Sequence, residues 1–455
     1  MEARRFRKSI MFLCRALIIA ALAAVFYVTY IRHYNVQVFY YKGNLLVTLL
    51  YTFLLVLLMS TYGGFKIGVY RLQELIFSGV LASFIADFVM YFVFCMIARK
   101  MLTPWPQCVA FLIQCALLVP LFIFAHRIHM CVYPPVDMLV LRAGTAHETE
   151  IIEKFEGKGT RQQIAAELLL TPELDWREAA APYAALLLGE IDTATRCDIM
   201  AYCFEHGKQC LMMPSMQDIL LNNATQFMAT DSLLYSCRNR SFTPDQLMLK
   251  RMMDIVLSAL ILLITSPLTL ATALIIKLQD GGPVFYRQER LTRNGERFML
   301  VKFRSMIVDA EKETGAVLAG KADKRITPFG HFIRAARIDE LPQLFNILKG
   351  EMSLVGPRPE RPELFHEICR EFPQFAYRLR VKAGLTGYAQ LYGRYNTSFE
   401  DKARLDLLYI ERVSVLQDLQ LLFFTVKIIF MKESTEGVRE NKEQEEDVAA
   451  RSIQP

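Results

Sequence analysis

The sequence lacks several patterns that would place it in a familiar class of soluble protein. None of its ten cysteines forms a Cys-x-x-Cys pair, so paired zinc or redox spacing is absent and reduced, buried thiols are expected. No basic tract accompanies the net charge of +6, so we expect no nucleic-acid partner, and the mild charge suits an anionic membrane surface. The first apolar segment has no small-residue cleavage site and is expected to be an anchor.

Apolar residues are abundant instead. They make up 53% of the 455 residues without glycine, and the mean hydropathy is +0.25. Charged residues still reach 22%, which is close to the value for soluble proteins. This balance indicates a part embedded in lipid joined to an ordinary aqueous part, with room for two or three domains.

Four long apolar stretches open the chain, and each supplies the roughly 20 residues that a helix needs to cross a bilayer. They lie at about 9–31, 44–63, 74–97 and 106–126. Basic residues precede the first stretch, and positive residues stay on the cytoplasmic side of a membrane. We therefore expect a membrane α-helical bundle of four spans within 1–130, with both of its ends in the cytoplasm.

Short β-rich runs alternate with helical periodicity after the bundle. The expected strands are Val136–Leu141, Ala184–Leu188 and Gln209–Met213, and the expected helices are His147–Phe155 and Thr193–His206. This alternation predicts a parallel sheet covered by helices, in a small Rossmann-like α/β module. One glycine follows the first strand where the dinucleotide-binding fingerprint needs three. We expect a module for packing or for pairing two copies into a homodimer.

These boundaries divide the chain into four parts. The α/β module occupies 131–240, and a third part with the chemistry-bearing motifs occupies 245–431. An acidic tail at 432–455 is expected to be solvated and disordered. We expect residues 1–240 to be dispensable for chemistry and to contribute to stability or pairing.

The third part begins with an apolar run, Ile255–Ile276, that Ser266-Pro267 interrupts. The run by itself fits a fifth transmembrane helix with a proline kink. A fifth crossing, however, would put the third part outside the cytoplasm, and charges flank both ends of the run. Pro267 lacks an amide hydrogen and Ser266 can bond a freed carbonyl. We therefore expect a re-entrant hairpin over 254–278 that enters and leaves by the same face.

Clusters of basic residues and one pair of carboxylates mark the candidate site. Guanidinium groups bind phosphate oxygens in pairs, so four basic clusters between 281 and 395 indicate a polyanionic ligand. Asp339-Glu340 lies between apolar residues, and neighbouring side chains on a helix diverge by roughly 100°. One carboxylate can attack an electrophile while the other holds a divalent cation. A solvated pair on the surface is the alternative.

Three motifs together resemble the bacterial sugar transferase family of monotopic phosphoglycosyl transferases. They are Lys302-Phe303-Arg304-Ser305-Met306, Asp339-Glu340-Leu341-Pro342-Gln343-Leu344 and Val355-Gly356-Pro357-Arg358-Pro359. The resemblance covers about 245–431 and implies an α+β monotopic catalytic domain with a re-entrant membrane hairpin broken at Ser266-Pro267. The bundle and the α/β module resemble the large-form members by architecture.

The resemblance implies an activity, namely transfer of a sugar-1-phosphate from a UDP-sugar to polyprenyl (undecaprenyl) phosphate with release of UMP. Such a step initiates exopolysaccharide, capsule or glycoconjugate assembly at the cytoplasmic face of the bacterial inner membrane. Asp339 would be the nucleophile that forms a covalent phosphosugar intermediate, and Glu340 would coordinate Mg²⁺. The implied phosphate-binding residues are Lys302, Arg304, Arg334 and Arg358. The Asp-x-x-Tyr spacing of Asp406 and Tyr409 resembles a wall of the site.

Two other functions stay open at this point. One is a membrane-bound glycosyltransferase that releases UDP, although the Asp-x-Asp metal signature expected of many such enzymes is absent. The other is a non-catalytic scaffold for polysaccharide assembly. Gly315–Ala322 nearly matches a phosphate-binding loop, but Ala322 replaces the hydroxyl that would bind Mg²⁺, so we reject it. Phe372–Arg380 mixes aromatic residues with cations and fits an interfacial element or an ordinary amphipathic surface.

Overall fold

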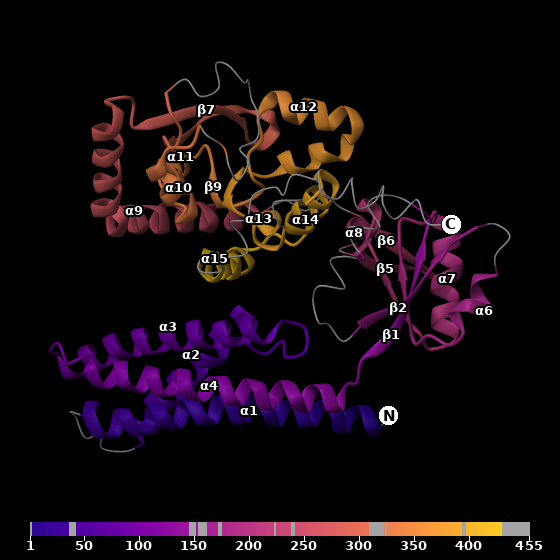
Figure 1. Cartoon of the computed structure of the whole chain (residues 1–455), viewed down its shortest axis with the longest axis horizontal. Coiled ribbons are helices and arrows are strands. Elements are labelled where there is room, and N and C mark those ends of the chain that lie inside the picture. Colours follow the sequence, from indigo (N-terminus) through magenta and orange to yellow (C-terminus); the bar gives the residue numbers. More distant parts are fainter. Residues whose placement is uncertain are drawn as a thin grey trace. The chain divides into compact units, whose positions relative to one another are not determined.

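The computed structural model describes residues 2–35, 42–144, 152, 162–171, 175–222, 224–237, 242–308, 323, 325–393 and 397–429. The chain divides into two compact units, Met1–Met213 and Pro214–Pro455 (Figure 1). Three sequence predictions lie outside the described residues: the helix His147–Phe155 (apart from Ile152), the loop Gly315–Ala322 and the tail 432–455.

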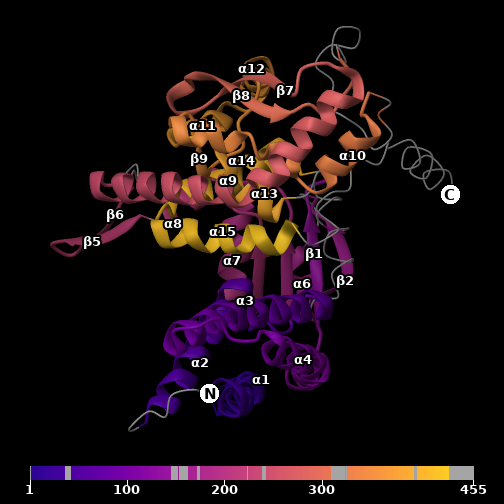
Figure 2. The same cartoon turned by 90° about the vertical axis from the view of Figure 1, so that its left-hand side faces the viewer.

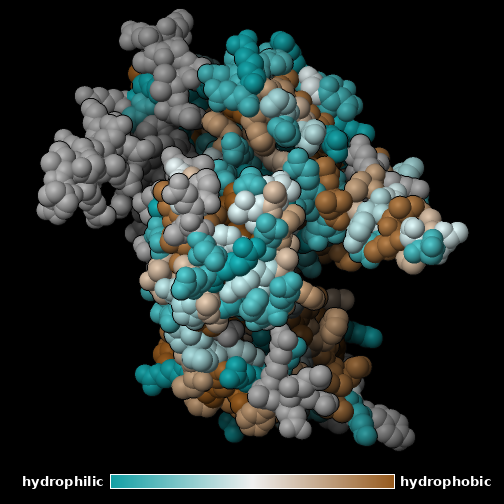
Figure 3. Space-filling model, turned by 90° about the vertical axis from the view of Figure 1, so that its right-hand side faces the viewer, coloured by the Kyte–Doolittle hydropathy of each residue, from teal (hydrophilic) through white to brown (hydrophobic). Residues whose placement is uncertain are grey.

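Four long helices open the unit Met1–Met213 and confirm the prediction from the apolar stretches. They are α1 (Glu2–Thr29), α2 (Gly43–Tyr62), α3 (Leu72–Ala98) and α4 (Trp105–Val132). Each is long and apolar enough to cross a membrane. Large apolar side chains are exposed along them, among them Phe12, Leu46 and Phe53, and brown surface marks this bundle in Figure 3. Apolar surface of this extent is unusual in water and fits a lipid environment.

A polar cluster lies inside this bundle and joins three of its helices. Asp87 on α3 accepts hydrogen bonds from the amide groups of Gln107 (2.9 Å) and Gln114 (3.5 Å) on α4. The Gln114 amide also donates to the hydroxyl of Tyr51 on α2, at 3.1 Å. All four side chains are buried. Because buried polar groups need partners, these contacts fix which faces of the helices meet.

A parallel four-stranded sheet follows, in the strand order β2-β1-β3-β4. The predicted strands are present as β1 (Val136–Arg142), β3 (Ala185–Leu188) and β4 (Gln209–Met212), and the predicted helix as α7 (Thr193–Glu205). Asp192 begins α7, because its carboxylate accepts a hydrogen bond from the Thr195 amide. The prediction of a parallel α/β module is therefore confirmed for these elements.

The strand β2 (Gln162–Leu169) and the short helix α6 (Trp176–Ala180) were not predicted. The sequence of β2, Gln-Gln-Ile-Ala-Ala-Glu-Leu-Leu, consists mainly of residues that favour helices. Its burial alternates residue by residue, as in a half-exposed strand. Pairing with β1 at the edge of the sheet thus overrides the local preference of this segment.

The helix α9 (Pro244–Asp280) opens the chemistry-bearing part of the second unit and is also long and apolar enough to cross a membrane. Thr243 and Gln246 form a reciprocal cap at its start, and Gly281 ends it in the left-handed conformation (φ +70°). Figures 1 and 2 show two limbs joined at a bend. Pro267 lies inside the helix, and the Ser266 hydroxyl donates to the Leu263 carbonyl at 2.8 Å. That carbonyl is the one Pro267 cannot bond, so the expected local chemistry of the break is present.

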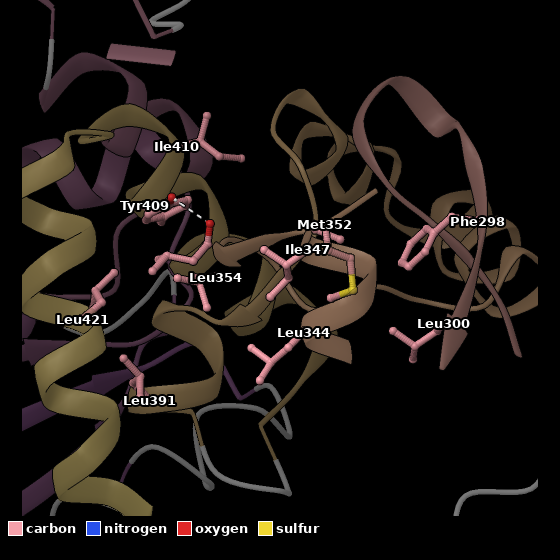
Figure 4. Packing of buried hydrophobic residues seen from close by; sticks show 12 residues of the cluster. Phe298, Leu300, Leu344, Ile347, Met352, Leu354, Leu391, Tyr409, Ile410 and Leu421 are labelled. Carbon is pink, nitrogen blue, oxygen red and sulfur yellow. Dashed lines mark hydrogen bonds between the residues drawn. The ribbon is translucent and has the colours of Figure 1, made fainter. Parts of the chain in front are cut away.

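The unit Pro214–Pro455 has one main apolar core and, besides α9, further helices and strands. They are α8 (Met216–Asn222), β5 (Thr225–Ala229), β6 (Ser232–Ser236), β7 (Phe285–Leu291), β8 (Arg297–Phe303), α10 (Pro328–Ala335), α11 (Gln343–Lys349), β9 (Ser353–Val355), α12 (Pro362–Glu371), β10 (Gly384–Thr386), α13 (Tyr388–Tyr392), α14 (Phe399–Glu411) and α15 (Val415–Ile429). The core joins β8, α11, β9, α14 and α15 through side chains that include Leu300, Ile347, Leu354, Tyr409 and Leu421 (Figure 4).

The helix α8 belongs to this second unit by its packing. Its buried residues Met216 and Ile219 share a core with Leu291 of β7, Phe365 of α12 and Leu407 of α14. The hairpin β5–β6 follows α8 and pairs in an antiparallel register. Contact between α8 and α14 therefore ties the segment just after Met213 to the part of the chain that carries the motifs.

Candidate active site

The Asp339-Glu340 pair lies on a 3₁₀ turn, Ile338–Glu340, between α10 and α11. The preceding residue, Arg337, adopts the left-handed conformation (φ +54°), which is uncommon for a side chain with a Cβ atom and reverses the chain after α10. Ile338 packs on Phe303 of β8 and Ile333 of α10, which anchors the turn. Asp339 is only 9% exposed. The alternative of a solvated surface pair is therefore wrong.

Three cations surround the carboxylate of Glu340. Lys302 Nζ on β8 lies 3.2 Å from Glu340 Oε1, and Arg358 Nη1 lies 3.4 Å from the same oxygen. Arg337 Nη1 lies 3.8 Å from Oε2. The strand β8, the turn after β9 and the start of the 3₁₀ turn thus converge on one side chain. The fold brings together the predicted residues Lys302, Glu340 and Arg358.

The pKa values of the two adjacent carboxyl groups, Asp339 and Glu340, shift in opposite directions from their ordinary values. Burial, reinforced by the charge of Glu340, raises the pKa of Asp339 to about 6 in spite of nearby Lys302, Arg334 and Arg358. Burial would also raise the pKa of Glu340, but Lys302, Arg358 and Arg337 outweigh it and hold that pKa well below its usual range. Glu340 is therefore a permanent anion, whereas Asp339 changes charge near neutral pH. Such divergence of paired groups is typical of catalytic sites.

Arg334, in the last turn of α10, lies close to the Asp339-Glu340 pair. Its Nε donates to the Ser305 hydroxyl at 2.8 Å, and its charge opposes the rise in the pKa of Asp339. Gly330 makes this packing possible, because a Cβ atom there would lie 1.9 Å from the Ser305 carbonyl oxygen. Arg304, in contrast, pairs with Asp280 at the end of α9. The structure thus places Arg304 on Asp280 at the end of α9, and not on Glu340.

The turn that carries Arg358 rests on a buried arginine, Arg378, and a partly buried one, Arg290, which sequence reasoning did not single out. Arg378 donates to the Arg358 carbonyl and Arg290 to the Pro359 carbonyl, both at 3.0 Å. Both also pair with Glu360, at 3.4 and 3.7 Å. Arg378 is only 4% exposed, so this residue of Phe372–Arg380 belongs to neither an interfacial element nor an amphipathic surface.

Asp406 and Tyr409 of α14 lie behind this turn. Asp406 Oδ2 is 2.9 Å from Arg378 Nη2, and burial raises the pKa of Asp406 to about 6. Tyr409 is 1% exposed, and its hydroxyl lies 2.8 Å from Asp418 Oδ1 and 3.2 Å from the Val355 carbonyl. Both side chains therefore support the segment that carries Arg358 from within the protein.

Asn346 on α11 joins the strand of Lys302 to the helix that follows the carboxylate pair. Its amide nitrogen donates to the Met299 carbonyl at 2.8 Å, and its oxygen accepts from the Val301 amide at 3.1 Å. The side chain is 1% exposed. A buried amide fully bonded to one strand edge fixes the register between β8 and α11, and so the distance from Lys302 to Glu340.

The donor set fits Mg²⁺ that arrives with phosphate groups. Carboxylate oxygens such as those of Glu340 and Asp339 are the ligands that Mg²⁺ prefers, usually one or two of them together with substrate phosphates. Lys302, Arg337 and Arg358 oppose a bare divalent cation here, whereas an anionic diphosphate would compensate their charge. In the part of the chain that the structure describes, no three His, Cys, Asp or Glu side chains gather into a metal cluster.

Fold and site together define a domain that begins with a long apolar helix and holds a carboxylate pair among cationic side chains. The family model described as bacterial sugar transferase matches residues 245–432. A sugar transferase of Bacillus subtilis without an assigned activity is 40% identical over 187 residues, which cover 41% of this chain and 90% of that protein. The chain belongs to the bacterial sugar transferase family.

Relatives with a named activity match a similar share of the chain. The UDP-N-acetylgalactosamine-undecaprenyl-phosphate N-acetylgalactosaminephosphotransferase of Aeromonas hydrophila is 41% identical over 190 residues, 41% of this chain and 45% of that protein. The undecaprenyl-phosphate galactose phosphotransferase of Salmonella typhimurium is 33% identical over 244 residues, half of each chain. The chain thus spans about half the length of these relatives.

Proposed function

We propose that this protein transfers a sugar-1-phosphate from a UDP-sugar to polyprenyl phosphate, through a covalent intermediate on Asp339 and with release of UMP. The observation that carries the proposal is the buried position of Asp339 beside Glu340, whose carboxylate has Lys302, Arg337 and Arg358 within 3.8 Å. Relatives are named for transfer of sugar phosphates to undecaprenyl phosphate. The transfer would initiate polysaccharide or glycoconjugate assembly.

The first step uses Asp339 as the nucleophile. Its carboxylate oxygen attacks the phosphorus that bears the sugar, the bond from that phosphorus to the bridging oxygen breaks, and UMP leaves with the electron pair. A carboxylate nucleophile splits one difficult displacement into two easier ones. In the second step an oxygen of polyprenyl phosphate attacks the same phosphorus, and the electron pair of the aspartyl bond returns to Asp339. The products are the polyprenyl diphosphate sugar and the free enzyme.

The neighbouring residues bind and neutralise the diphosphate. Phosphoryl transfer relies mainly on positioning and on charge compensation, which Lys302, Arg334 and Arg358 supply from three elements. Glu340 would hold Mg²⁺, which when bound neutralises phosphate oxygens and the developing charge of UMP. Arg304 acts at the end of α9, through its ion pair with Asp280.

For the membrane arrangement, we propose that α9 enters and leaves by the cytoplasmic face of the bacterial inner membrane while α1 to α4 cross it. Leu263, Leu270 and Leu278 on α9 are 71–75% exposed, which suits contact with lipid. The hydrogen bond from Ser266 to Leu263 satisfies the carbonyl that Pro267 frees, and unpaired carbonyls are costly in hydrocarbon. This arrangement would bring a soluble donor and a lipid acceptor to one site.

Product analysis tests the proposal. Purified full-length protein with Mg²⁺, undecaprenyl phosphate and a panel of UDP-sugars should release UMP with at least one sugar. Release of UDP would favour a glycosyltransferase without a covalent intermediate, and no turnover with any sugar would favour a scaffold. Incubation with donor alone should add the mass of one sugar phosphate to the protein.

Substitution of the carboxylates sharpens this test. Asp339→Asn should lower turnover by about 10³-fold or more and abolish the mass adduct, since removal of a nucleophile has effects of that order. Glu340→Gln should raise the Mg²⁺ concentration needed for half-maximal rate. The exposed Glu371 at the end of α12 offers a matched control, and Glu371→Gln should behave as wild type. An adduct of normal mass and yield on Asp339→Asn would refute the role of this residue.

A further inference from the structure

The first turns of α9 hold two segments that border the candidate site, through side chains that the proposed reaction does not use. Lys250 Nζ donates to the Val355 carbonyl at 3.1 Å, directly before Gly356 and the turn of Arg358. The same ammonium group pairs with Asp418 of α15 at 2.5 Å. Lys250 is 7% exposed and Asp418 is fully buried. An ammonium group so deeply buried needs such partners, and they fix its position.

Tyr409 completes this contact from the opposite side. Its hydroxyl lies 3.2 Å from the Val355 carbonyl, the bond drawn as a dashed line in Figure 4, and 2.8 Å from the second oxygen of Asp418. The single hydroxyl hydrogen of Tyr409 is shared between these two acceptors, so the donors of α9 and α14, Lys250 and Tyr409, both lie at the Val355 carbonyl. Asp418 links these two donors, so the end of β9 is held by a closed network.

One helical turn further along α9, Asp254 holds the body of β9. Its Oδ1 accepts from the Leu354 amide at 3.0 Å and from the Ser353 hydroxyl at 3.2 Å. Asp254 is 3% exposed and Ser353 is fully buried. Lys250 and Asp254 are four residues apart and so lie on one face of the helix. This face contacts every residue of β9.

Arg251 holds the other segment. Its two terminal nitrogens donate to the carbonyls of Ile347 (2.6 Å) and Leu348 (2.7 Å) in the last turn of α11. The helix α11 starts three residues after Glu340 and ends at Gly350 in the left-handed conformation (φ +91°). The guanidinium thus bonds two carbonyls of the last turn, of which that of Ile347 also accepts from the Gly350 amide at 3.0 Å. It fixes the far end of the helix that follows the carboxylate pair.

We infer that Lys250, Arg251 and Asp254 are positioning residues, which make the start of the membrane helix the reference that sets the distance between Glu340 and Arg358. Glu340 precedes α11 and Arg358 follows β9. Neighbouring side chains of α9 form hydrogen bonds with both α11 and β9. This inference rests on the proposed function. It extends that function, because the position of α9 would set the separation of the Glu340 and Arg358 side chains between which the diphosphate binds.

Kinetics of full-length variants test the inference. Lys250→Met should lower kcat/KM by roughly 10-fold to 100-fold and raise KM for the UDP-sugar, because small displacements of a binding group have effects of that size. A merely structural role would lower the amount of active protein at unchanged KM. Tyr409→Phe removes one hydroxyl and should raise KM in the same direction, which keeps the test decisive if Lys250→Met does not fold. Lys349→Met, at an exposed lysine of α11, is the matched control and should keep the wild-type KM.

A double-mutant cycle shows whether Lys250 acts through Arg358. In an Arg358→Ala background, Lys250→Met should change KM much less than it does in wild type, because residues that act through one another are not additive. Additive effects, or an unchanged KM in both Lys250→Met and Tyr409→Phe, would overturn the inference while the proposed function stands. Failure of the wild-type protein to release UMP from any UDP-sugar would overturn both.

Discussion

At the scale of single residues, the candidate site depends on one carboxyl group that stays charged beside one that does not. Glu340 has three cations within 3.8 Å, whereas the cations near Asp339 only partly offset its burial. Asp339 and Glu340 are neighbours in the sequence, but their side chains lie in different surroundings. This difference in surroundings suits them to different roles. The anion can hold a cation while its neighbour is available for covalent chemistry.

The raised pKa of Asp339 predicts an acidic limit to activity. The attacking form is the carboxylate, and with a pKa of about 6 that form is lost as the pH falls through about 6. The value of kcat/KM for the UDP-sugar should therefore fall roughly tenfold per pH unit below that point, while Glu340 stays ionised. Initial rates of UMP release between pH 5 and 8 measure this, and a flat profile down to pH 5 would contradict it.

Substitution of Arg334 tests whether the acidic limit of activity reflects the pKa of Asp339. Its positive charge lowers the pKa of Asp339, so Arg334→Met should move the acidic limb to higher pH. A limb that stayed in place while the maximal rate fell would assign Arg334 to phosphate binding alone.

The sequence could supply the residue types of this site but not their partners. Asp339-Glu340, Lys302 and Arg358 stand in recognisable motifs, and the structure brings them together. Arg378 could not be found in this way, because its partners include the carbonyl of a residue 20 positions away, and any residue has a carbonyl. Arg304 stands next to Lys302 in the motif but pairs with Asp280, and only the end of α9 determines that.

At the scale of elements, α9 is a long apolar helix with a bend at Pro267. Pro267 has no amide hydrogen to donate to the Leu263 carbonyl, and the Ser266 hydroxyl donates to that carbonyl instead. A straight helix of 37 residues would be about 55 Å long, well over the roughly 30 Å of a bilayer core. In the proposed hairpin, the bend would let an apolar segment of this length return to the membrane face from which it came.

Pro267→Ala combined with Ser266→Ala should straighten α9 and let part of the protein cross the membrane. The physical reason is that alanine restores the missing amide donor and removes the ring that clashes with the preceding turn. In a cysteine-free version, single cysteines placed at Asp245 and Asp280 should both react from the cytoplasmic side in the parent. In the double variant a fraction should react at Asp280 from the opposite side.

Pro120 lies inside α4 and offers the control for this experiment. Pro120→Ala should leave the labelling unchanged, because α4 is already expected to cross. Opposite-side labelling of Asp280 in the parent protein itself would refute the hairpin and make α9 a fifth span.

Elements with strong local signals could be predicted, and those that depend on pairing could not. The strands β1, β3 and β4 are short apolar runs between turn residues, and the structure confirms them. The edge strand β2 is rich in Ala, Glu and Leu, so only its register with β1 makes it a strand. The hairpin β5–β6 was missed for a similar reason, since its apolar side chains on both faces give no regular alternation.

At the scale of the whole molecule, the division after Met213 differs from the boundary near 240 that composition suggests. The difference arises because α8 packs its apolar side into the second unit through Met216 and Ile219. Burial of two such side chains contributes roughly 3–6 kcal/mol before other terms oppose it. The helix α8 is therefore structural for the unit that carries the motifs.

A truncated protein that begins at Pro214 should retain UMP release, whereas one that begins at Thr243 should lose stability. The expected loss is a few kcal/mol, on the order of the apolar burial of α8. Thermal unfolding in detergent and turnover per folded molecule measure it. Met216→Ala with Ile219→Ala in the full chain should reproduce most of the loss. Equal stability of both truncations would show that α8 contributes nothing to this unit.

The cluster of Asp87, Gln107, Gln114 and Tyr51 has a consequence for how the N-terminal helices assemble. Leucine and phenylalanine faces are nearly interchangeable in lipid, so helices covered with them could rotate about their axes at little cost. A rotation of α3 that turned Asp87 toward acyl chains would instead expose a carboxyl group to hydrocarbon. The polar cluster therefore favours one orientation of α2, α3 and α4 about their own axes, the one in which its four side chains face one another.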